Sequence, residues 1–228
     1  MASKKSKCPD AERPRKRTAC LAQIAFERLR RAILTGELKE GERVRESRLA
    51  ADWNMGLTPL REAVRRMAAI GYLVLQPNRA PVVRKLSGDD IRQVYELRKL
   101  LEGFALRSNC KAIGRDDLMA LRKLAAKADA ATTTKGRLQI QFALDTKLHQ
   151  LWTFRCGNPW LTDSLERLLI YRPNLMNLLV DHRDLVERAF EEHKQILAAL
   201  EKQNIEKAVQ LLGAHIQKSG TALSALSK

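Results

Sequence analysis

The sequence predicts a mainly α-helical protein in two parts, a small unit of three helices with one β-hairpin and a bundle of about six helices. Three observations support this fold class. Aromatic residues are only 5% of the 228 residues, while Leu, Ala, Arg and Glu are abundant, which favours helix over sheet. Apolar residues recur every three or four positions almost throughout, as on one face of a helix. The exception is a short alternating stretch near residues 72–86, which is typical of paired strands.

The net charge of +16 is concentrated at the start of the chain. Residues 1–19 contain seven Lys or Arg against two acidic residues, and residues 20–86 contain thirteen against seven. The rest of the chain contains 22 against 17. This distribution predicts a polyanionic partner, nucleic acid rather than a membrane, because no lipid-anchoring apolar face accompanies the charge. Residues 1–19 are predicted to be a basic disordered tail.

No feature of the sequence indicates export or insertion into a membrane. No apolar run approaches the roughly 18 residues that a transmembrane helix needs, and the first ten residues lack the apolar core of a signal peptide. The four cysteines are scattered, with no CxxC pair and no disulfide framework. We therefore expect a cytoplasmic protein.

Residues 20–86 are predicted to form the small unit. Apolar spacing indicates a first helix that starts at Ala22 and stops at Gly36. A second, short helix is predicted over 46–53, followed by Asn54 at a position that often needs a left-handed backbone. A third helix follows, with Thr58 as its N-cap and a proline at its first helical position. The hairpin comes last, with YLVLQ and PVVRKL as strands and PNRA as the turn.

This order of elements describes a winged helix-turn-helix, in which the third helix contacts DNA bases and the hairpin contacts the flanking groove or backbone. Taken singly, each arginine of this unit fits an ordinary solvated face; the arrangement as a whole favours DNA. The candidate DNA contacts are Arg45, Arg48, Thr58, Arg61, Arg65 and Arg79.

Two motifs in this unit, LRxxIxxGxL from Leu29 and TPxREA from Thr58, resemble the winged-helix domain of GntR-type bacterial transcriptional regulators. The resemblance extends over about 60 residues and implies that Arg61 contacts DNA. Some positions depart from the family pattern: Glu40 replaces a proline, Gly56-Leu57 replaces Ser-Arg, and Ala80 replaces a glycine. Because the family arginine at position 57 usually contacts DNA, we expect an altered operator sequence, or weaker binding offset by the basic tail.

From Ser87 onward every stretch is predicted to be helical, so residues 87–228 should form the bundle. Ser87 is the predicted N-cap of the first helix, with acidic residues in its first turn. No strand pattern, glycine-rich phosphate loop or Ser-His-Asp motif is present. The helices are expected over 87–108 and near 114–130, 135–156, 159–177, 181–202 and 204–223, with Asn204 capping the last.

Four residues of the bundle are candidate metal ligands. Asp145 and His149 are four residues apart, so one helix presents both on the same, otherwise apolar face. His193 and His215 lie on the apolar stripes of two other helices. A carboxylate and imidazoles buried together are costly unless they bind something, and a divalent ion suits them, Zn²⁺ first and Ni²⁺, Fe²⁺ or Mn²⁺ as alternatives. Each histidine alone would also fit a hydrogen-bonded core position.

The pattern of Asp-x-x-x-His, Glu-His-x-x-Ile around His193 and a last-helix His resembles the metal-binding ligand domain of the FadR subfamily of GntR regulators. The resemblance implies an effector bound near the metal. Four protein ligands leave one or two positions open on a five- or six-coordinate ion, where a small carboxylate-containing metabolite could bind. Arg98 and Arg172 are candidates for holding that carboxylate, and both would also fit surface ion pairs.

Two classes of function are compatible with these features. The first is a metabolite-responsive transcriptional regulator, a repressor like most members of the resembled family, bound to a two-fold DNA operator as a homodimer. Residues 87–228 would then be its effector-binding, metal-binding and dimerisation domain. The second is a metal-dependent hydrolase or oxygenase with a non-specific nucleic-acid-binding basic segment. No clearly placed general base accompanies the metal ligands, and the enzyme would leave the helix-turn-helix unexplained. We therefore expect a regulator and no catalytic residues.

Overall fold

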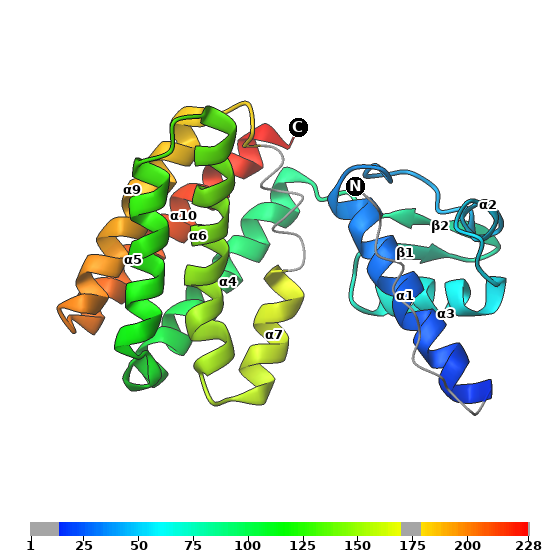
Figure 1. Cartoon of the computed structure of the whole chain (residues 1–228), viewed down its shortest axis with the longest axis horizontal. Helices are drawn as coiled ribbons and strands as arrows, with labels where there is room; N and C mark the ends of the chain where they lie inside the picture. Colours follow the sequence, from blue (N-terminus) through cyan, green and yellow to red (C-terminus); the bar gives the residue numbers. More distant parts are fainter. Residues whose placement is uncertain (1–13, 170–178, 228) are drawn as a thin grey trace. The chain divides into compact units, whose positions relative to one another are not determined.

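The computed structural model describes residues 14–169 and 179–227, and the chain divides between Lys85 and Leu86 into two compact units. Both units are mainly helical, and the described residues contain one two-stranded sheet, in the first unit (Figure 1). The predicted fold class, a helix-turn-helix with a hairpin wing followed by a helical bundle, is confirmed.

The first unit is built around its third helix. Its elements are α1 (Pro14–Leu34), α2 (Glu46–Asp52), α3 (Leu57–Ala69), β1 (Leu73–Gln76) and β2 (Arg79–Val83). Helices α1 and α2 and strand β1 all pack against α3. Leu29 of α1 and Leu60, Val64 and Met67 of α3 are fully buried, so the apolar stripe predicted for the third helix forms the core of this unit.

The first helix begins earlier than its apolar spacing predicts. Helix α1 starts at Pro14 and therefore includes the last residues of the segment predicted as a disordered tail, while residues 1–13 lie outside the described residues. The added residues 14–21 include Arg, Lys and Ala, which favour helix, and a proline at the first helical position. The apolar spacing gave no sign of this extension.

The N-cap predicted for the third helix, Thr58, is wrong. Helix α3 starts at Leu57, the N-cap is Gly56, and no side chain caps the helix, so Thr58 lies inside its first turn. Pro59 is tolerated there because the first N–H groups of a helix have no intrahelical acceptor. The left-handed Asn54 is confirmed by its φ of 49°, and Gly36 after α1 has a φ of 75°.

The wing is an antiparallel hairpin with a tighter turn than predicted. Its strands pair Leu73 with Val83 and Gln76 with Arg79, which leaves a two-residue turn in place of the predicted four-residue turn. Asn78 has a φ of 55°, and a left-handed residue in the turn lets so short a connection close. Arg79 therefore begins β2 at the tip of the wing.

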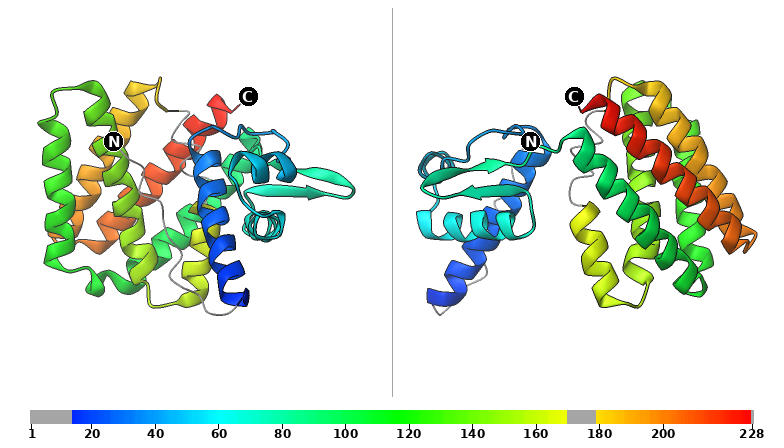
Figure 2. Two further views of the ribbon diagram at one scale, coloured as in Figure 1. Left: turned by 45° about the vertical axis from the view of Figure 1, so that its right-hand side comes forward. Right: turned by 180° about the vertical axis from the view of Figure 1, so that it is seen from behind.

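The second unit is a bundle of long helices. Its elements are α4 (Gly88–Asn109), the 3₁₀ turn η1 (Cys110–Ala112), α5 (Arg115–Asp129), α6 (Thr134–Arg155), α7 (Pro159–Leu169), α9 (Arg183–Glu201) and α10 (Ile205–Leu226). Helices α4 and α10 run side by side, and α9 packs against α5, α6 and α10 (Figure 2). The end of the predicted helix 159–177 lies outside the described residues.

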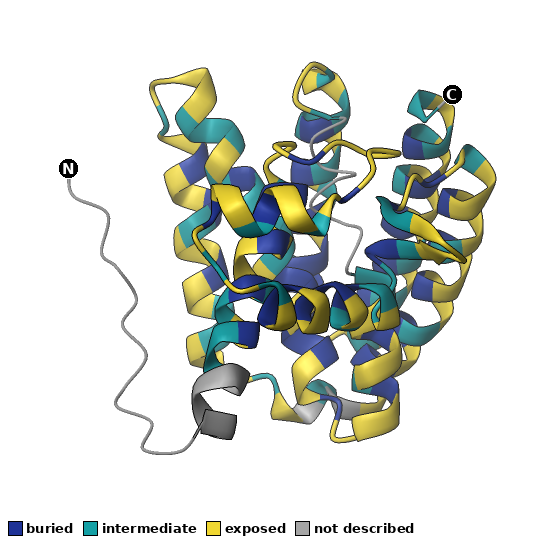
Figure 3. Cartoon of the chain, turned by 90° about the vertical axis from the view of Figure 1, so that its right-hand side faces the viewer, coloured by how far each residue is buried: buried dark blue, intermediate teal, exposed yellow. Residues whose placement is uncertain are grey.

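The helices of the bundle begin at the predicted caps. Ser87 and Asp90 form a reciprocal capping box at the start of α4, and the Asn204 side chain accepts a hydrogen bond from the Lys207 N–H at the start of α10. Both caps satisfy N–H groups that would otherwise lack a partner. Buried and exposed residues alternate around the helices (Figure 3), as expected for amphipathic helices around a shared core.

Helices α4 and α10 approach each other closely at Gly220. A Cβ at this position would lie 2.6 Å from the Cβ of Tyr95, so a larger residue would push the helices apart. The close approach brings the inward face of α10, which carries His215, near the inward face of α4.

Candidate metal centre and DNA-binding surface

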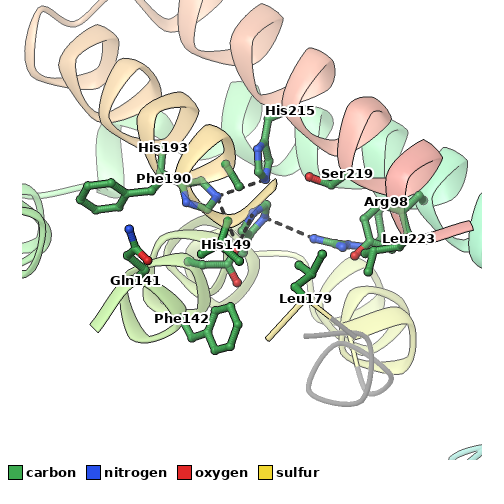
Figure 4. A pocket seen from close by; sticks show the side chains of 14 residues that line it. Arg98, Gln141, Phe142, His149, Leu179, Phe190, His193, His215, Ser219 and Leu223 are labelled. Atoms are coloured by element: carbon green, nitrogen blue, oxygen red, sulfur yellow. Dashed lines mark hydrogen bonds and ion pairs between the residues drawn. The ribbon is translucent and has the colours of Figure 1, made fainter. Parts of the chain in front are cut away.

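Three helices bring the four predicted ligands together inside the second unit. Asp145 and His149 come from α6, His193 from α9 and His215 from α10, and one ligand atom from each lies within 4.8 Å of the others. The three histidines are buried, and their rings lie close together, with centroids 4.3 to 5.7 Å apart (Figure 4). The four residues predicted from helical spacing therefore lie together in the interior of the bundle.

The atoms that meet are the ones that bind metals. The Nε2 atom of His193 lies 3.1 Å from Nε2 of His215 and 3.2 Å from Oδ1 of Asp145. The same carboxylate oxygen lies 3.7 Å from Nε2 of His149. Each imidazole thus presents its Nε2 atom, and Asp145 presents one oxygen.

Two of the histidines have a carboxylate at Nδ1, the ring nitrogen that does not point into the cluster. The Nδ1 atom of His149 contacts Oε2 of Glu102, and Nδ1 of His215 lies 2.9 Å from Oε2 of Glu192. A carboxylate that accepts from Nδ1–H leaves the Nε2 lone pair available for a ligand and fixes the direction of the ring. Both contacts therefore orient Nε2 toward the cluster.

These carboxylates have further partners that keep them charged. Glu102 is fully buried and also contacts Arg98 Nε at 2.8 Å and Trp152 Nε1 at 2.9 Å. Burial alone would raise the pKa of Glu102, but its interactions with His149 and Arg98 and the hydrogen bond from Trp152 hold it well below its usual range. Glu192, which also binds Lys218 Nζ at 2.9 Å, has its pKa lowered to about 2 despite its partial burial.

The ring of His215 is kept neutral by its surroundings. Burial and the neighbouring His193 lower the pKa of His215 well below its ordinary value, and the opposing contact with Glu192 does not restore it. A neutral imidazole with a free Nε2 lone pair is the form that ligates a metal. The electrostatics of the pocket and the geometry of the ring therefore favour the same state.

The donor set fits a divalent ion. Two ligand atoms that are each about 2.1 Å from one ion lie roughly 3–4 Å apart, and the three distances given above, 3.1, 3.2 and 3.7 Å, fall in that range. His149 Nε2 is buried and has no hydrogen-bond partner among the described residues, although buried polar atoms normally have one. An ion at the centre of the cluster would satisfy this atom.

A small cavity opens beside the cluster. Its volume is about 50 Å³, and since one water needs roughly 10–15 Å³ on this measure, it admits a group of only a few non-hydrogen atoms. Apolar side chains make up much of its lining, among them Phe142, Leu179 and Phe190, and Gln141, Ser219 and Arg98 add polar groups (Figure 4).

Of the two predicted effector-binding arginines, only Arg98 lies among the described residues. Arg98 lines the cavity, but it is 3% exposed and its Nε atom is engaged by Glu102, so it is not the surface ion-pair residue that the sequence left possible. Its Nη2 atom lies 3.4 Å from His149 Nδ1. Arg172 lies outside the described residues.

Sequence reasoning missed Glu102 and gave Glu192 no role at the metal cluster. Glu102 carried a detectable signal, because Ile91, Tyr95, Arg98 and Glu102 follow helical spacing and are all buried. Glu192 carried none, because it neighbours His193 in the chain yet contacts His215 of the adjacent helix. A contact of that kind depends on how two helices pack.

The candidate DNA contacts lie on α2, on α3 and on the wing of the first unit, except for Arg45, which is the N-cap residue before α2. Arg61 on α3 is exposed and pairs with Glu46 of α2, with Nε 3.3 Å from Oε2. Arg48 Nε lies 3.6 Å from Asp52 Oδ2, and both side chains are exposed. These exposed pairs are weak in water, so both arginines can exchange a carboxylate for a phosphate. Arg45, Thr58, Arg65 and Arg79 are also exposed.

No helix among the described residues is long and apolar enough to span a bilayer.

Two family models match the chain. The model of the FCD domain matches residues 93–218, and the model described as bacterial regulatory proteins, gntR family, matches residues 21–83. The first match contains all four candidate metal ligands, and the second contains the helix-turn-helix and the wing.

Individual relatives match over most of the chain. The uncharacterized HTH-type transcriptional regulator YdhC of Bacillus subtilis is 28% identical over 192 residues, which are 83% of this chain and 85% of that protein. The HTH-type transcriptional repressor RspR of Escherichia coli is 25% identical over 198 residues, or 86% of each chain. Among solved structures, E. coli McbR/YncC superposes with a TM-score of 0.71 at 24% identity, over 89% of this chain and 96% of that chain, and so shares the fold.

Proposed function

Because the chain belongs to the GntR family of bacterial regulatory proteins and carries an FCD domain, we propose that it is a repressor whose operator affinity is modulated by a small organic acid bound at or near a metal ion. It is a DNA-binding transcriptional regulator, like its relatives, and not an enzyme. The proposal of repression draws on the relatives RspR and GlaR, both named as transcriptional repressors. Its operator would be bacterial chromosomal DNA, so it would act in the cytoplasm.

The observation that carries this proposal is the convergence of three Nε2 atoms and the Asp145 carboxylate on one point beside a cavity. Nitrogen-rich donor sets of this kind favour Zn²⁺, with Ni²⁺, Fe²⁺ or Mn²⁺ as alternatives. The ion would supply a Lewis acid with open positions that attract a carboxylate. The three histidines and Asp145 would hold it, and Glu102 and Glu192 would fix the directions of His149 and His215.

The acid proposed for this site is small, because the cavity is about 50 Å³. Its carboxylate would lie against the metal, with Arg98 as the nearby cation and Ser219 as a hydroxyl on the same cavity wall. Arg98 already has its charge balanced by Glu102, so it would orient the acid while the metal provides the uncompensated positive charge. Arg172 remains a second candidate for this role.

The DNA side of the proposal rests on the first unit. A homodimer would place two copies of α3 on a two-fold operator, as paired helix-turn-helix proteins do. Arg61 and Arg65 of α3, with Thr58 in its first turn, would contact DNA, and Arg45, Arg48 and Arg79 would bind the backbone nearby. Leu57 is the first residue of α3, and it would not make the DNA contact that the family's arginine makes at this position.

The test is fluorescence anisotropy on DNA from upstream of the protein's own gene, at several salt concentrations, for the wild type and Arg61→Ala. We expect tight binding that survives an excess of unrelated duplex and is lost in Arg61→Ala. Binding that is equal for every duplex and for both proteins, and that depends on salt alone, would contradict a sequence-specific operator.

The effector half is tested with Zn²⁺-loaded protein and a panel of small acids such as acetate and lactate. We expect at least one acid to change operator affinity in the wild type and to have no effect on His193→Ala, which should still bind DNA. By linkage, operator DNA must change the affinity for that acid by the same factor. An acid that acts equally on wild type and His193→Ala would place the effector elsewhere.

A further inference from the structure

We propose that Gln141 selects the effector acid by accepting a hydrogen bond from a hydroxyl group that the acid carries away from its carboxylate. This inference rests on the proposed function, an acid held at a metal beside the cavity, and it names the class of acid as a short hydroxy acid. Gln141 is on α6, about one helical turn before the candidate metal ligand Asp145.

Gln141 is a buried polar side chain in the wall of the cavity. It is 3% exposed and lines the cavity beside the metal cluster. Its Nε2 atom donates to Oε1 of Glu187 at 2.9 Å, and no described residue donates to its Oε1 atom. An acid that fills the cavity displaces water from this oxygen, and it loses affinity unless it supplies a donor of its own.

The orientation of the Gln141 amide is fixed by Glu187. The pKa of Glu187 is lowered to about 2, chiefly by its hydrogen bond from Arg137, so the group is ionised at neutral pH. A carboxylate accepts hydrogen bonds and does not donate them. The NH₂ group of Gln141 must therefore face Glu187, and its oxygen faces away from Glu187 toward the cavity. The cavity wall thus presents an acceptor at this point and not a donor.

Glu187 is in turn held in place by Arg137. The Nε and Nη2 atoms of Arg137 each lie 2.7 Å from an oxygen of Glu187, and its Nη1 atom donates to the Ala128 carbonyl at 2.8 Å. A bidentate pair of arginine and carboxylate has a specific geometry. Glu187 is therefore a positioning residue, which acts on the acid through Gln141.

Gln141 and Arg98 lie on opposite sides of the three histidines (Figure 4). Arg98 carries the positive charge that suits a carboxylate, and Ser219 lies on the same side (Figure 4). The side of Gln141 offers an uncharged acceptor. Because the cavity is about 50 Å³, the acid has only a few non-hydrogen atoms. The two sides together fit a short acid with its carboxylate toward Arg98 and a donor toward Gln141.

The donor that fits this side of the cavity is a hydroxyl group. Phe142 and Phe190 lie beside Gln141 (Figure 4), and an ammonium group buried among them would need a counter-charge. The charge of Glu187 is already balanced by Arg137. A keto, ether or carboxylate oxygen only accepts hydrogen bonds, so it would face the Gln141 oxygen with no proton between them.

The first experiment measures the binding of lactate, β-hydroxypropionate and propionate to the full-length, Zn²⁺-loaded protein by isothermal titration calorimetry. The two hydroxy acids place the hydroxyl on different carbons, and propionate has none. We expect at least one hydroxy acid to bind about tenfold more tightly than propionate, which is what one buried hydrogen bond commonly contributes. Equal affinities for all three acids would overturn the proposal.

Gln141→Met tests whether Gln141 is the source of the preference. Methionine keeps the unbranched shape of glutamine and has no strong acceptor. The preference for the hydroxy acid over propionate should fall by about tenfold, while propionate should bind as it does to the wild type. The matched control is Gln150→Met, on the exposed side of the same helix, which should keep the preference. A preference that survives Gln141→Met would contradict the assignment.

Methoxyacetate tests the orientation of the amide. It is an isomer of both hydroxy acids, but its ether oxygen accepts and does not donate. The wild type should bind the preferred hydroxy acid about tenfold more tightly than methoxyacetate. Glu187→Gln should reduce this difference, because a glutamine at this position can donate to the Gln141 oxygen and let the NH₂ group of Gln141 turn toward the cavity. An unchanged difference would show that Glu187 does not position Gln141.

Operator binding separates failure of this inference from failure of the proposed function. A hydroxy acid that binds through Gln141 but leaves operator affinity unchanged would refute the proposed function alone. If propionate binds and changes operator affinity as strongly as the hydroxy acids do, in the wild type and in Gln141→Met, selection by Gln141 alone is refuted. If no acid of this panel binds the Zn²⁺-loaded protein, both are refuted.

Discussion

The carboxylate of Glu102 has three polar partners and no solvent exposure, which makes it the most constrained charge near the metal cluster. It balances the equally buried Arg98 on its own helix and holds His149 on α6. Buried ion pairs add little net stability, but removing one partner is expensive because the other charge remains in the interior. Glu102 therefore links the integrity of the core to the direction of a metal ligand.

Glu102→Gln tests this role. We expect it to lower the free energy of unfolding by about 3–5 kcal/mol, since it leaves Arg98 buried without a counter-charge. The measurement is urea denaturation in the presence of a chelator, so that metal binding does not contribute. The matched control is Glu96→Gln on the exposed side of α4, which should change stability by less than about 0.5 kcal/mol. Equal effects of the two variants would contradict the prediction.

Leu57→Arg tests the missing cation of the DNA-binding unit. Position 57 is the first of α3 and half-buried, and an arginine there should neutralise one more phosphate. The logarithm of operator affinity should then fall more steeply with the logarithm of salt concentration, by about 0.9 in slope. Leu57→Gln is the neutral control and should keep the wild-type slope. Identical slopes for all three proteins would mean that position 57 does not reach the DNA backbone.

The ligands could be predicted from sequence because each lies on a buried stripe of its own helix. Asp145 and His149 interrupt the stripe of α6, and His193 and His215 those of α9 and α10. The carboxylates behind them depend on tertiary packing. Glu192 contacts a histidine of the next helix, and no periodicity within a single helix contains that information.

At the scale of elements, the presence of each helix could be predicted from the periodicity of its apolar residues. The position of its ends depended on whether a capping side chain was present. The side-chain caps Ser87 and Asn204 were predictable because their residue types and spacing are specific. The starts of α1 and α3 were not, because α1 continues past its apolar stripe and α3 begins at a glycine without a side-chain cap. Boundaries without a capping side chain leave only weak signals.

Helices α6 and α9, which carry three of the four metal ligands, are joined by an ion pair. Arg137 Nε and Nη2 each lie 2.7 Å from an oxygen of Glu187, and Gln141 donates to the same carboxylate at 2.9 Å. These hydrogen bonds, chiefly those from Arg137, lower the pKa of Glu187 to about 2. A carboxyl group whose pKa is lower in the folded state stabilises the fold above its unfolded pKa, and this contribution is lost as the pH falls through the folded value.

Glu187→Gln should therefore destabilise the protein at pH 7 and matter less in acid. The expected loss is about 0.5–1 kcal/mol, because the pair is partly exposed and screened by solvent. The difference from the wild type should shrink as the pH falls from about 4.5 toward about 2. Chemical denaturation of both proteins across this pH range is the measurement. A difference that stays constant with pH would show that the charge of Glu187 is not its source.

At the scale of the whole molecule, the proposed regulation requires that a signal from the metal cavity reach the chain segment that joins the two units. Helix α10 spans that distance within the second unit. His215, Ser219 and Leu223 line the cavity, and the next residues hold the start of the unit: Ser224 Oγ donates to Gly88 O at 2.7 Å, and Ser227 Oγ donates to Leu86 O at 2.8 Å. One helix therefore contacts both the cavity and the residues that follow the unit boundary at Lys85.

This arrangement predicts that the two serines transmit the effect of the acid on operator affinity and do not themselves contribute to binding of DNA or Zn²⁺. The double variant Ser224→Ala, Ser227→Ala should keep the wild-type affinity for operator DNA and for Zn²⁺, because neither serine is a ligand or lies in the first unit. The change in operator affinity caused by an active acid should fall, since α10 would no longer hold Leu86 and Gly88. Coupling energies between sites are commonly about 1–3 kcal/mol, so a loss of half would be measurable as a reduced shift in anisotropy titrations. The matched control is Thr221→Ala, because its hydroxyl bonds to Gln217 O on its own helix. If the double variant and Thr221→Ala respond to the acid as the wild type does, the signal does not travel through the end of α10.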